Sequence, residues 1–305
     1  MTDTAARPTG DGERPAYDTS ALPLVPPSAT TGLFEVFRRR YLLRLLVRRE
    51  ISARYQGSFL GILWSYVNPF TQFLLYYFVL GIVVGLGDRF ENFAVHVFCG
   101  LVVVSFFTET FNAGTRSIVG NRQLVQKMAV PREMFPVASM LVSGYHVLPQ
   151  IAILVVISLW YGWSPDPVGM LGMVVALLII GVLGTALALL FSAANVFFRD
   201  FAQVVNVLTN FVRFGVPMIY PYTLVSERFG SFATLYLANP IADAVLLVQR
   251  AFWVGTTQDP AEYTRLHIPD HILLIGLGAL AGSVVVLVVG QLVFSRLENK
   301  IPERL

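Results

Sequence analysis

Two ionisable side chains, Glu109 and Arg213, stand inside long apolar stretches of this 305-residue chain. An ionised group at the centre of a bilayer costs about 2.5–3.5 kcal/mol, so each should face a partner or a water-filled cavity. Arg213 lies roughly 16 Å into its stretch, at about 1.5 Å per helical residue, and Glu109 lies nearer the C-terminal end of its own. The two side chains could form an ion pair. The alternative is that each reaches the membrane surface or pairs elsewhere.

The common catalytic motifs are missing from the sequence. Neither Lys127 nor Lys300 has the Gly-rich approach and following Ser or Thr of a phosphate-binding loop, so we expect no ATP site in this chain. The single cysteine, Cys99, excludes an internal disulfide and a cysteine-based metal site. The four histidines are scattered, and each is expected to be a packed or interfacial side chain rather than a ligand. We therefore expect a protein that is not an enzyme and holds no cofactor or metal itself.

Long apolar runs set the class of the chain. Hydrophobic residues make up 55% of the sequence and charged residues 13%, about half the charged fraction of a soluble domain. A helix needs roughly 20 apolar residues to cross the hydrocarbon core. The runs predict one all-α membrane domain over 55–300, with six spans at about 66–86, 93–115, 137–160, 170–195, 203–221 and 271–294.

Basic residues predict the orientation of these spans. Lys and Arg concentrate in the segments that share a side with the N-terminus, above all in 38–54, and cytoplasmic loops carry this excess. Both termini are therefore expected on the cytoplasmic side of a bacterial inner membrane. Residues 1–32 have no apolar stretch and are rich in Thr, Ala, Pro, Gly and Asp, which predicts a disordered cytoplasmic tail.

Residues 33–54 predict an amphipathic helix at the membrane surface. Arginines cover most of its surface, and the apolar residues that recur at helical spacing are Phe34, Phe37, Tyr41 and Leu45. Such a helix lies in the headgroup plane, where anionic lipids attract its arginines. It either anchors the topology alone or also touches a cytoplasmic partner. The candidate partner contacts are Arg48, Arg49 and Arg54.

A second cytoplasmic candidate is the loop at 116–136, between the second and third spans. An apolar helical pattern inside it is flanked by charges, and prolines punctuate its end. A short loop needs no ordered helix, which favours docking to a partner over an ordinary solvated linker. The candidate docking residues are Arg122, Leu124, Lys127, Arg132 and Glu133.

Residues 222–270, on the expected outer side, are unusually apolar for a connection. The run 229–242 carries no charge, and a second apolar piece, 244–248, follows a break at Asn239, Pro240 and Asp243. Apolar runs of this length favour re-entrant or interfacial helices, which lie at membrane depth only against protein or a water-filled cavity. The alternative is a hairpin that lies on the outer surface.

Two strings, RYQGSFLGILWSYVNP at 54–69 and NRQLVQKMAVPREMFP at 121–136, carry a resemblance to a known family. They closely resemble the start of the first span and the cytoplasmic loop of polysaccharide ABC exporter permeases, the type-2 or Wzm-like kind. FFRDF at 197–201, VPMIYP at 216–221 and LANP at 237–240 are similar to other parts of these permeases. Gly215 and Val216 stand where a Ser commonly precedes the proline, and Arg213 departs from the pattern.

The resemblance implies a homodimeric permease that works with two copies of an ABC ATPase, on which ATP and Mg are bound. It implies that the N-terminal helix and the 116–136 loop dock this ATPase, and that short re-entrant helices within 222–270 form a gate. The dimer would enclose a channel for a polyprenyl-diphosphate-linked polysaccharide. No nucleic-acid partner is expected. The residues assigned to the gate are Asn239, Pro240 and Arg250.

Aromatic residues are frequent in the first and fifth expected spans. They are either packing and lipid contacts or the wall of such a channel, where the apolar faces of sugars stack on rings. The candidates for channel lining are Phe70, Phe73, Tyr76, Tyr77, Phe211, Phe214 and Tyr220.

The sequence does not identify the exported polymer. Only two of the 22 basic residues are lysines, which suggests a high-GC genome. Wzm-like systems of high-GC bacteria export a lipid-linked galactan, and O-antigen and teichoic acid are the next candidates.

A permease for a drug or small lipid is the nearest alternative, although such proteins usually have longer extracytoplasmic domains or a fused ATPase. A membrane enzyme acting on polyprenyl phosphate would need acid or His clusters at one membrane face. A simple channel or receptor does not explain the docking helices.

Overall fold

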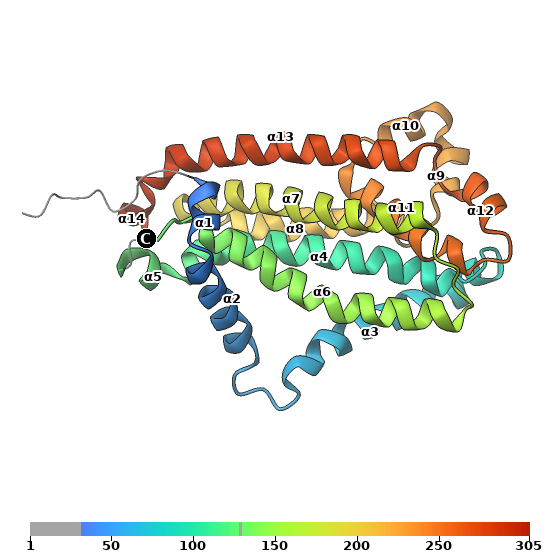
Figure 1. The fold of residues 1–305 in the computed structure, drawn as a ribbon, viewed down its shortest axis with the longest axis horizontal. Coiled ribbons are helices and arrows are strands. Elements are labelled where there is room, and N and C mark those ends of the chain that lie inside the picture. Colours follow the sequence, from blue (N-terminus) through green and yellow to red (C-terminus); the bar gives the residue numbers. More distant parts are fainter. Residues whose placement is uncertain (1–31, 128–129) are drawn as a thin grey trace, which may run out of the picture.

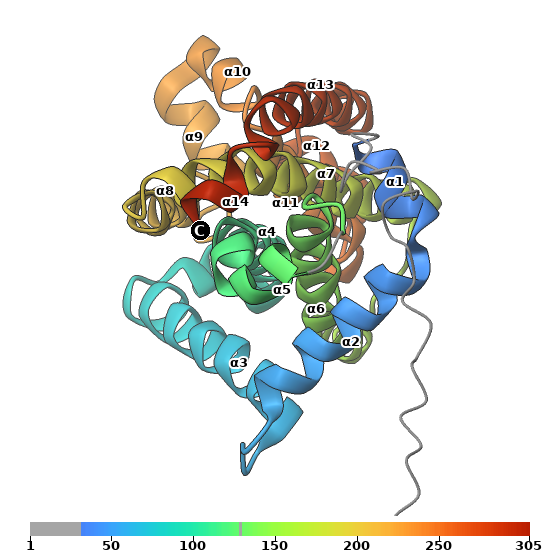
Figure 2. The same ribbon diagram turned by 90° about the vertical axis from the view of Figure 1, so that its left-hand side faces the viewer.

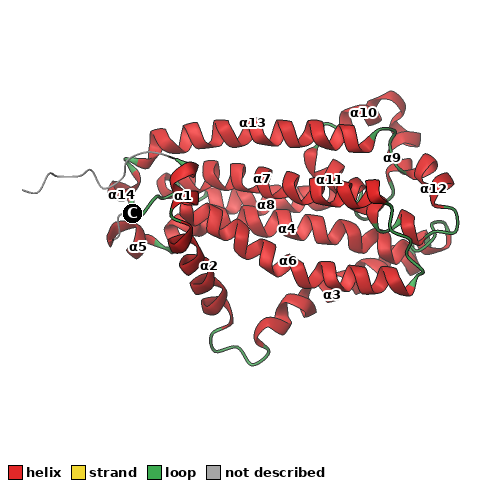
Figure 3. Cartoon of the chain, in the orientation of Figure 1, coloured by secondary structure: helices red, strands yellow, loops and turns green. Residues whose placement is uncertain are grey.

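The computed structural model describes residues 32–127 and 130–305, and every regular element in these stretches is a helix (Figure 3). The all-α class is therefore confirmed. The tail predicted for 1–32 lies outside the described residues except for Gly32. The long helices run roughly side by side along one axis (Figure 1).

Five helices are long and apolar enough to cross a membrane. They coincide with five of the six expected spans and are α3 (Trp64–Tyr76) with the π-helical η3 (Tyr77–Val83) that continues it, α4 (Phe93–Gly120), α6 (Met134–Trp160), α7 (Pro167–Phe197) and α13 (Ile272–Glu298). Two short 3-10 turns, η2 (Gly61–Leu63) and η4 (Leu86–Asp88), precede α3 and follow η3.

The fifth expected span, 203–221, has a different form. Its helix, α8 (Phe201–Phe214), has 14 residues, fewer than the roughly 20 that a full crossing needs, so six full-length spanning helices are not confirmed. The helix ends before Gly215, and Pro217 and Pro221 prevent the next residues from continuing it. This irregular segment packs on the bundle instead: Nε2 of Gln249 donates to the carbonyl of Pro217 at 2.6 Å.

Helix α4 lies at the centre of the bundle, as the view from the end that carries α5 (Arg122–Lys127) shows (Figure 2). It packs against α7, α6, α8 and α3, and most of its residues are buried. The main hydrophobic core surrounds it. A second core lies at the end of the bundle that carries α1 (Leu33–Arg38) and α14 (Ile301–Arg304). It joins these short helices to α6, α7 and α13.

Glycines permit the closest helix contacts around α4. A Cβ atom added to Gly114 would lie 2.4 Å from Cβ of Ala188 on α7, and one added to Gly184 of α7 would lie 2.8 Å from Cγ2 of Thr110. Helices in lipid associate largely through van der Waals packing, and small residues let their backbones approach. The close α4–α7 contact therefore requires glycine, which has no side chain, at positions 114 and 184.

The predicted N-terminal helix forms as two pieces, α1 (Leu33–Arg38) and α2 (Arg40–Tyr55), which meet at Arg39. They cross the end of the bundle that also carries α5 and α14 (Figure 1). One side of this helix pair packs on the second core through Val36, Leu43 and Leu46. The predicted apolar stripe stays exposed and comprises Phe34, Phe37, Tyr41 and Leu45. An exposed apolar stripe beside arginines is typical of a helix in the membrane surface.

The loop after α4 contains one short helix, α5 (Arg122–Lys127), and its residues 128–129 lie outside the described part. The chain then returns to the bundle through two polar contacts. Nη1 of Arg132 donates to the backbone carbonyl of Glu298 at 2.6 Å, and Nε2 of Gln291 donates to Oε1 of Glu133 at 2.9 Å. Glu133 is 1% exposed. Contrary to the prediction, its carboxylate faces α13 rather than a docking surface.

The segment 222–270 is a series of short helices at the opposite end of the bundle. They are α9 (Tyr222–Phe229), η5 (Gly230–Phe232), α10 (Ala233–Tyr236), α11 (Pro240–Ala251), η6 (Val254–Thr256) and α12 (Pro260–His267). The break at Asn239 is real, because its side chain caps α11 and Pro240 occupies the first helical position. Asp243 lies inside α11 and does not interrupt it, contrary to the prediction.

Gly114→Ala should destabilise the folded chain, because the new methyl group overlaps with Ala188 unless α4 and α7 separate. Overpacking costs about 1–3 kcal/mol, which outweighs the gain in helix propensity of about 1 kcal/mol. The matched control is Gly278→Ala on α13, where nothing lies within 4 Å of the added Cβ. Thermal unfolding in detergent should show a lower midpoint for Gly114→Ala and an unchanged or higher one for the control. Equal midpoints would contradict the close α4–α7 contact.

Candidate functional site

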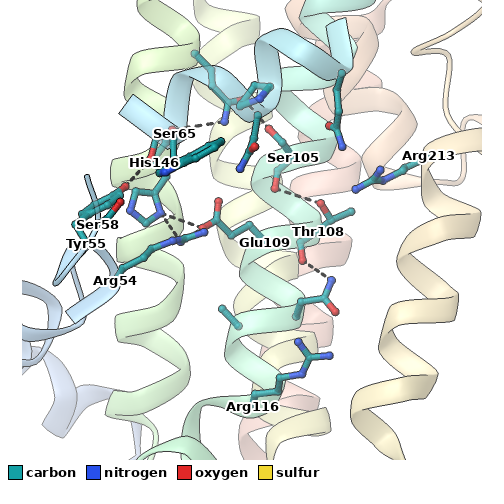
Figure 4. Close-up of a pocket in the computed structure, with 17 residues that line it drawn as sticks. Arg54, Tyr55, Ser58, Ser65, Ser105, Thr108, Glu109, Arg116, His146 and Arg213 are labelled. Atoms are coloured by element: carbon teal, nitrogen blue, oxygen red, sulfur yellow. Dashed lines mark hydrogen bonds and ion pairs between the residues drawn. The ribbon is translucent and has the colours of Figure 1, made fainter. Parts of the chain in front are cut away.

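A polar cavity of about 660 Å³ lies beside the half of α4 nearer to α5. Its walls come from the turn between α2 and α3 and from α3, α4, α6 and α8 (Figure 4). The two helices on its flanks, α3 and α8, are far apart in the sequence and both contact α4. The cavity is therefore built on the central helix of the bundle.

Each wall contributes a polar stripe from an otherwise apolar helix. The stripe of α4 consists of Ser105, Thr108, Glu109, Asn112 and Arg116. These residues recur every three or four positions and so share one helix face. The other walls add Ser65, Asn68 and Gln72 from α3, His146 and Gln150 from α6, and Arg213 from α8. Ionisable residues that face inward at membrane depth indicate a water-filled cavity or a substrate path.

Arg54, Glu109 and His146 meet in this cavity (Figure 4). Nη1 of Arg54, near the end of α2, donates to Oε1 of Glu109 on α4. Nδ1 of His146, on α6, lies 2.9 Å from the same oxygen and 2.7 Å from Nη1 of Arg54. One ring nitrogen cannot donate to Glu109 and accept from Arg54 at once, so the tautomer of His146 decides which contact is a hydrogen bond. The cluster joins the N-terminal helix to two spanning helices.

Further hydrogen bonds hold the walls of the cavity together. Oγ of Ser105 donates to Oε1 of Gln150 at 2.7 Å and connects α4 to α6. Nδ2 of Asn112 lies 3.3 Å from Oγ1 of Thr209 and connects α4 to α8. The polar stripe of α4 is thus satisfied partly by the neighbouring stripes, as side chains away from water require.

Arg213 enters the cavity from α8. Its guanidinium extends from the last turn of α8 toward α4, whereas Arg116 lies farther toward the α5 end (Figure 4). The ion pair considered for Arg213 and Glu109 does not form, because Glu109 pairs with Arg54 and His146. Within residues 32–127 and 130–305, Arg213 takes part in no ion pair. Arg116 donates to Oδ1 of Asn206 at 3.1 Å.

None of the seven aromatic residues proposed as channel lining borders this cavity. Phe70, Phe73 and Tyr77 do form a stripe on α3 and η3, with ring centroids 6.3 Å and 5.9 Å apart along it. Phe73 is 8% exposed and packs edge-on against Phe98. Phe73 therefore supports α3 from within the chain, contrary to the prediction of a lining residue.

The remaining aromatic candidates differ in exposure. Tyr76 is partly buried, and Phe211 and Phe214 are 71% and 62% exposed on α8. The hydroxyl of Tyr220 donates to the carbonyl of Phe214 at 2.8 Å and lies 3.2 Å from the hydroxyl of Tyr236. Tyr220 thus connects the end of α8 to the α9–α10 region.

The proposed docking residues separate into two groups. Arg48, Arg49, Arg122 and Lys127 are exposed at the α5 end of the bundle, and Leu124 is half-buried. Nη1 of Arg49 donates to Oδ1 of Asn121 at 3.1 Å, so α2 contacts the loop before α5. In contrast, the guanidinium of Arg54 faces the cavity, and the side chains of Arg132 and Glu133 face α13.

The sequence indicates Glu109 and Arg213 as intramembrane charges but does not identify the residues around them. His146 is a packed side chain, as the sequence predicts, but its contact with Glu109 is not predicted. Arg116 is predicted in the loop and instead lies on α4. The signal that identifies both is periodicity: the polar residues of α4 and α6 repeat every three or four positions inside apolar runs. No three His, Cys, Asp or Glu residues gather in the described part to hold a metal ion.

Comparisons with known proteins agree with this architecture. The ABC-2 type transporter family matches residues 41–253. The chain is 30% identical over 242 residues to the O-antigen export system permease protein RfbA of Myxococcus xanthus, which is 79% of this chain and 91% of that protein. It is 28% identical over 217 residues to an RfbA of Klebsiella pneumoniae, covering 70% and 81% of the two chains. A second Klebsiella pneumoniae RfbA is 25% identical over 263 residues, covering 86% and 94%.

The family match extends from α2 to the end of α11 and includes every helix that lines the cavity. It covers well over half of the chain, and the similarity to the Myxococcus xanthus permease spans most of both proteins. The chain belongs to the ABC-2 type transporter family.

Proposed function

We propose that this chain is the transmembrane permease subunit of an ATP-driven exporter that moves a polysaccharide linked to a polyprenyl diphosphate across the inner membrane. The observation that carries the proposal is the extent of the similarity to O-antigen export permeases, of which this chain covers 81%, 91% and 94%. The likeness therefore involves nearly the whole permease rather than one motif.

The cavity beside α4 supports this proposal physically. Its hydroxyl, amide and guanidinium groups can hydrogen-bond to sugar hydroxyls at a depth where lipid offers no partner. Exposed rings stand on both flanking helices, Phe70 on α3 and Phe211 and Phe214 on α8. In a homodimer, the cavities of two copies would face one channel, and these rings would supply its apolar surfaces.

The end of the bundle with α1, α2, α5 and α14 is proposed to face the cytoplasm. Both described chain ends lie there (Figure 1). Exposed arginines and Lys127 on α2 and α5 form the surface on which two copies of an ABC ATPase would dock. That partner would bind ATP and Mg, and the exposed apolar stripe of α1 and α2 would hold the helix against anionic lipids.

Helix α11 supports a re-entrant gate at the opposite, extracytoplasmic end. Its 12 residues are too few to cross a bilayer, yet it is buried against α4, α7 and α13. Short helices are tolerated at membrane depth where protein surrounds them. Arg250, near the end of α11, lies 3.5 Å from Asp166, which caps α7, so this ion pair ties the gate to the start of α7.

The polymer is proposed to be a lipid-linked galactan, followed by O-antigen and then teichoic acid. The galactan assignment rests on the Arg-rich, Lys-poor composition, whereas the similarity to O-antigen permeases supports only the polysaccharide class. Export of a drug remains the alternative within the family.

Depletion of this chain in its own bacterium tests the function. We expect a polyprenyl-linked polysaccharide to accumulate inside the cell while the same polymer disappears from the surface, because the carrier cannot cross without the permease. Sugar analysis of the accumulated material identifies the polymer. The control is restoration of surface polymer by a plasmid copy of the chain. Unchanged surface polysaccharide together with a new drug sensitivity would contradict the proposal and favour drug export.

Charge reversal at α5 tests the docking surface. Arg122→Glu combined with Lys127→Glu should weaken ATPase association roughly ten-fold, since single exposed ion pairs contribute about 0–1 kcal/mol each. Arg132 is left intact because it anchors the loop to Glu298. The matched control is Arg228→Glu with Arg265→Glu, two exposed arginines at the other end of the bundle. If the ATPase co-purifies equally with both double variants, α5 is an ordinary linker and not a docking surface.

The Arg54–Glu109 pair connects the proposed docking helix to the cavity. Arg54→Gln and Glu109→Gln should each lower the thermal midpoint and export, since each leaves one charge without its partner. We expect the double variant to lose less than the sum of the singles, with a coupling of about 1 kcal/mol because Arg54 is half-exposed. Strictly additive losses would show that the pair does not couple the two helices.

A further inference from the structure

The charge balance of the cavity points to a specific part of the substrate. The described lining holds three arginines, Arg54, Arg116 and Arg213, against one carboxylate, Glu109. That carboxylate is already engaged by Arg54 and His146. A guanidinium keeps its proton in proteins, so at membrane depth it needs a counter-anion or water. Within the described residues Arg213 has no counter-anion, which leaves this position open to an anionic ligand.

We propose that Arg213 binds a phosphate group of the lipid headgroup that carries the exported polymer, with Arg116, on the α4 wall, as a second cation of the same cavity. This inference rests on the proposed function. The oxygens of phosphate, like those of carboxylate, match the paired N–H donors of a guanidinium, and the proposed substrate carries a diphosphate. The cavity, at about 660 Å³, lies within the size range of small-molecule sites. It therefore has room for a diphosphate together with water.

Helix α8 indicates that the phosphate belongs to a lipid. Arg213 faces the cavity (Figure 4), whereas Phe211 and Phe214, two residues before and one after it, are 71% and 62% exposed. A ligand with a phosphate head and an isoprenoid tail can place its head at Arg213 and lay its tail against these rings. A free phosphate ion uses only the first of these two features.

Two other polar groups at the cavity lack a partner. Nε2 of His146 and Oδ1 of Asn112 are buried and, within the described part of the chain, form no hydrogen bond. His146 is 3% exposed. When Nδ1 of His146 accepts from Arg54, the proton of the neutral ring sits on Nε2, which is then an unused donor. Buried polar groups are normally satisfied, and a hydrated phosphate in the cavity supplies both acceptors and bridging water.

Binding of farnesyl diphosphate to the full-length chain in phosphatidylcholine nanodiscs tests the inference. The variants are Arg213→Gln, which removes the charge, and Arg213→Lys, which keeps the charge but loses the fork. The matched control is Arg265→Gln, the same change at an exposed arginine of α12 outside the cavity. We expect Arg213→Gln to weaken binding on the order of ten-fold, Arg213→Lys to fall between, and the control to match the unaltered chain. Thermal midpoints verify that each variant is folded.

Farnesol and inorganic diphosphate separate the contributions of tail and head. Farnesol should bind equally to the unaltered chain and to Arg213→Gln, because it has no phosphate. Inorganic diphosphate should compete at least ten-fold less well than farnesyl diphosphate, since it has no tail for α8. Equal competition would overturn the lipid assignment, and equal binding of farnesyl diphosphate to Arg213→Gln would overturn the phosphate site. Neither result bears on the proposed export function, because polymer export by the unaltered chain is measured separately.

Discussion

Polar groups inside a bilayer must find their partners within the protein, because lipid offers none, and this constraint governs α4 and the helices around it. Along one side of α4, Gly114 brings the backbone against Ala188 of α7, where close packing holds the two helices together. A hydrogen bond of 3.3 Å from Nδ2 of Asn195 to the carbonyl of Thr115 supports this contact. Along another side runs the polar stripe from Ser105 to Arg116. That stripe cannot face lipid, so α3, α6 and α8 cover it with polar stripes of their own. One central helix thereby builds both the core and the cavity.

The same constraint explains where the N-terminal helix ends. Arg54 stands near the end of α2, and its ion pair with Glu109 holds that end at the cavity. Gly57, with a φ of 74°, then turns the chain, a conformation that glycine adopts without strain. A 2.5 Å hydrogen bond between the hydroxyls of Tyr55 and Ser65 closes the turn before α3. Because α2 also contacts Asn121 next to α5, it connects the proposed docking surface directly to the cavity.

Much of this architecture follows from local sequence, and what does not follow depends on tertiary contacts. The long apolar runs, the N-terminal amphipathic helix and the break at Asn239 and Pro240 are properties of single segments, and hydropathy, periodicity and proline predict them. The partner of Glu109 is not such a property, since Arg54 lies 55 positions away and His146 lies 37 positions away. Phe73 and Glu133 depend on tertiary contacts in the same way: both belong to surface patterns in the sequence, yet α4 and α13 bury them.

Helix α8, which replaces the fifth expected span, is short, and its early end explains how Arg213 can lie so far from the end of the bundle that carries α5. Arg213 is in the last turn of α8, which stops at Phe214. The C-terminal end of a helix carries a partial negative charge from its free carbonyl groups, and a cation there is favoured. Were 203–221 one continuous helix, the same arginine would sit in its interior without this help. The irregular residues that follow are stabilised by Gln249, which donates to Pro217, and by Gly100, which makes room for Met218 against α4. The break in this span and the arginine beside the cavity are therefore two consequences of one arrangement.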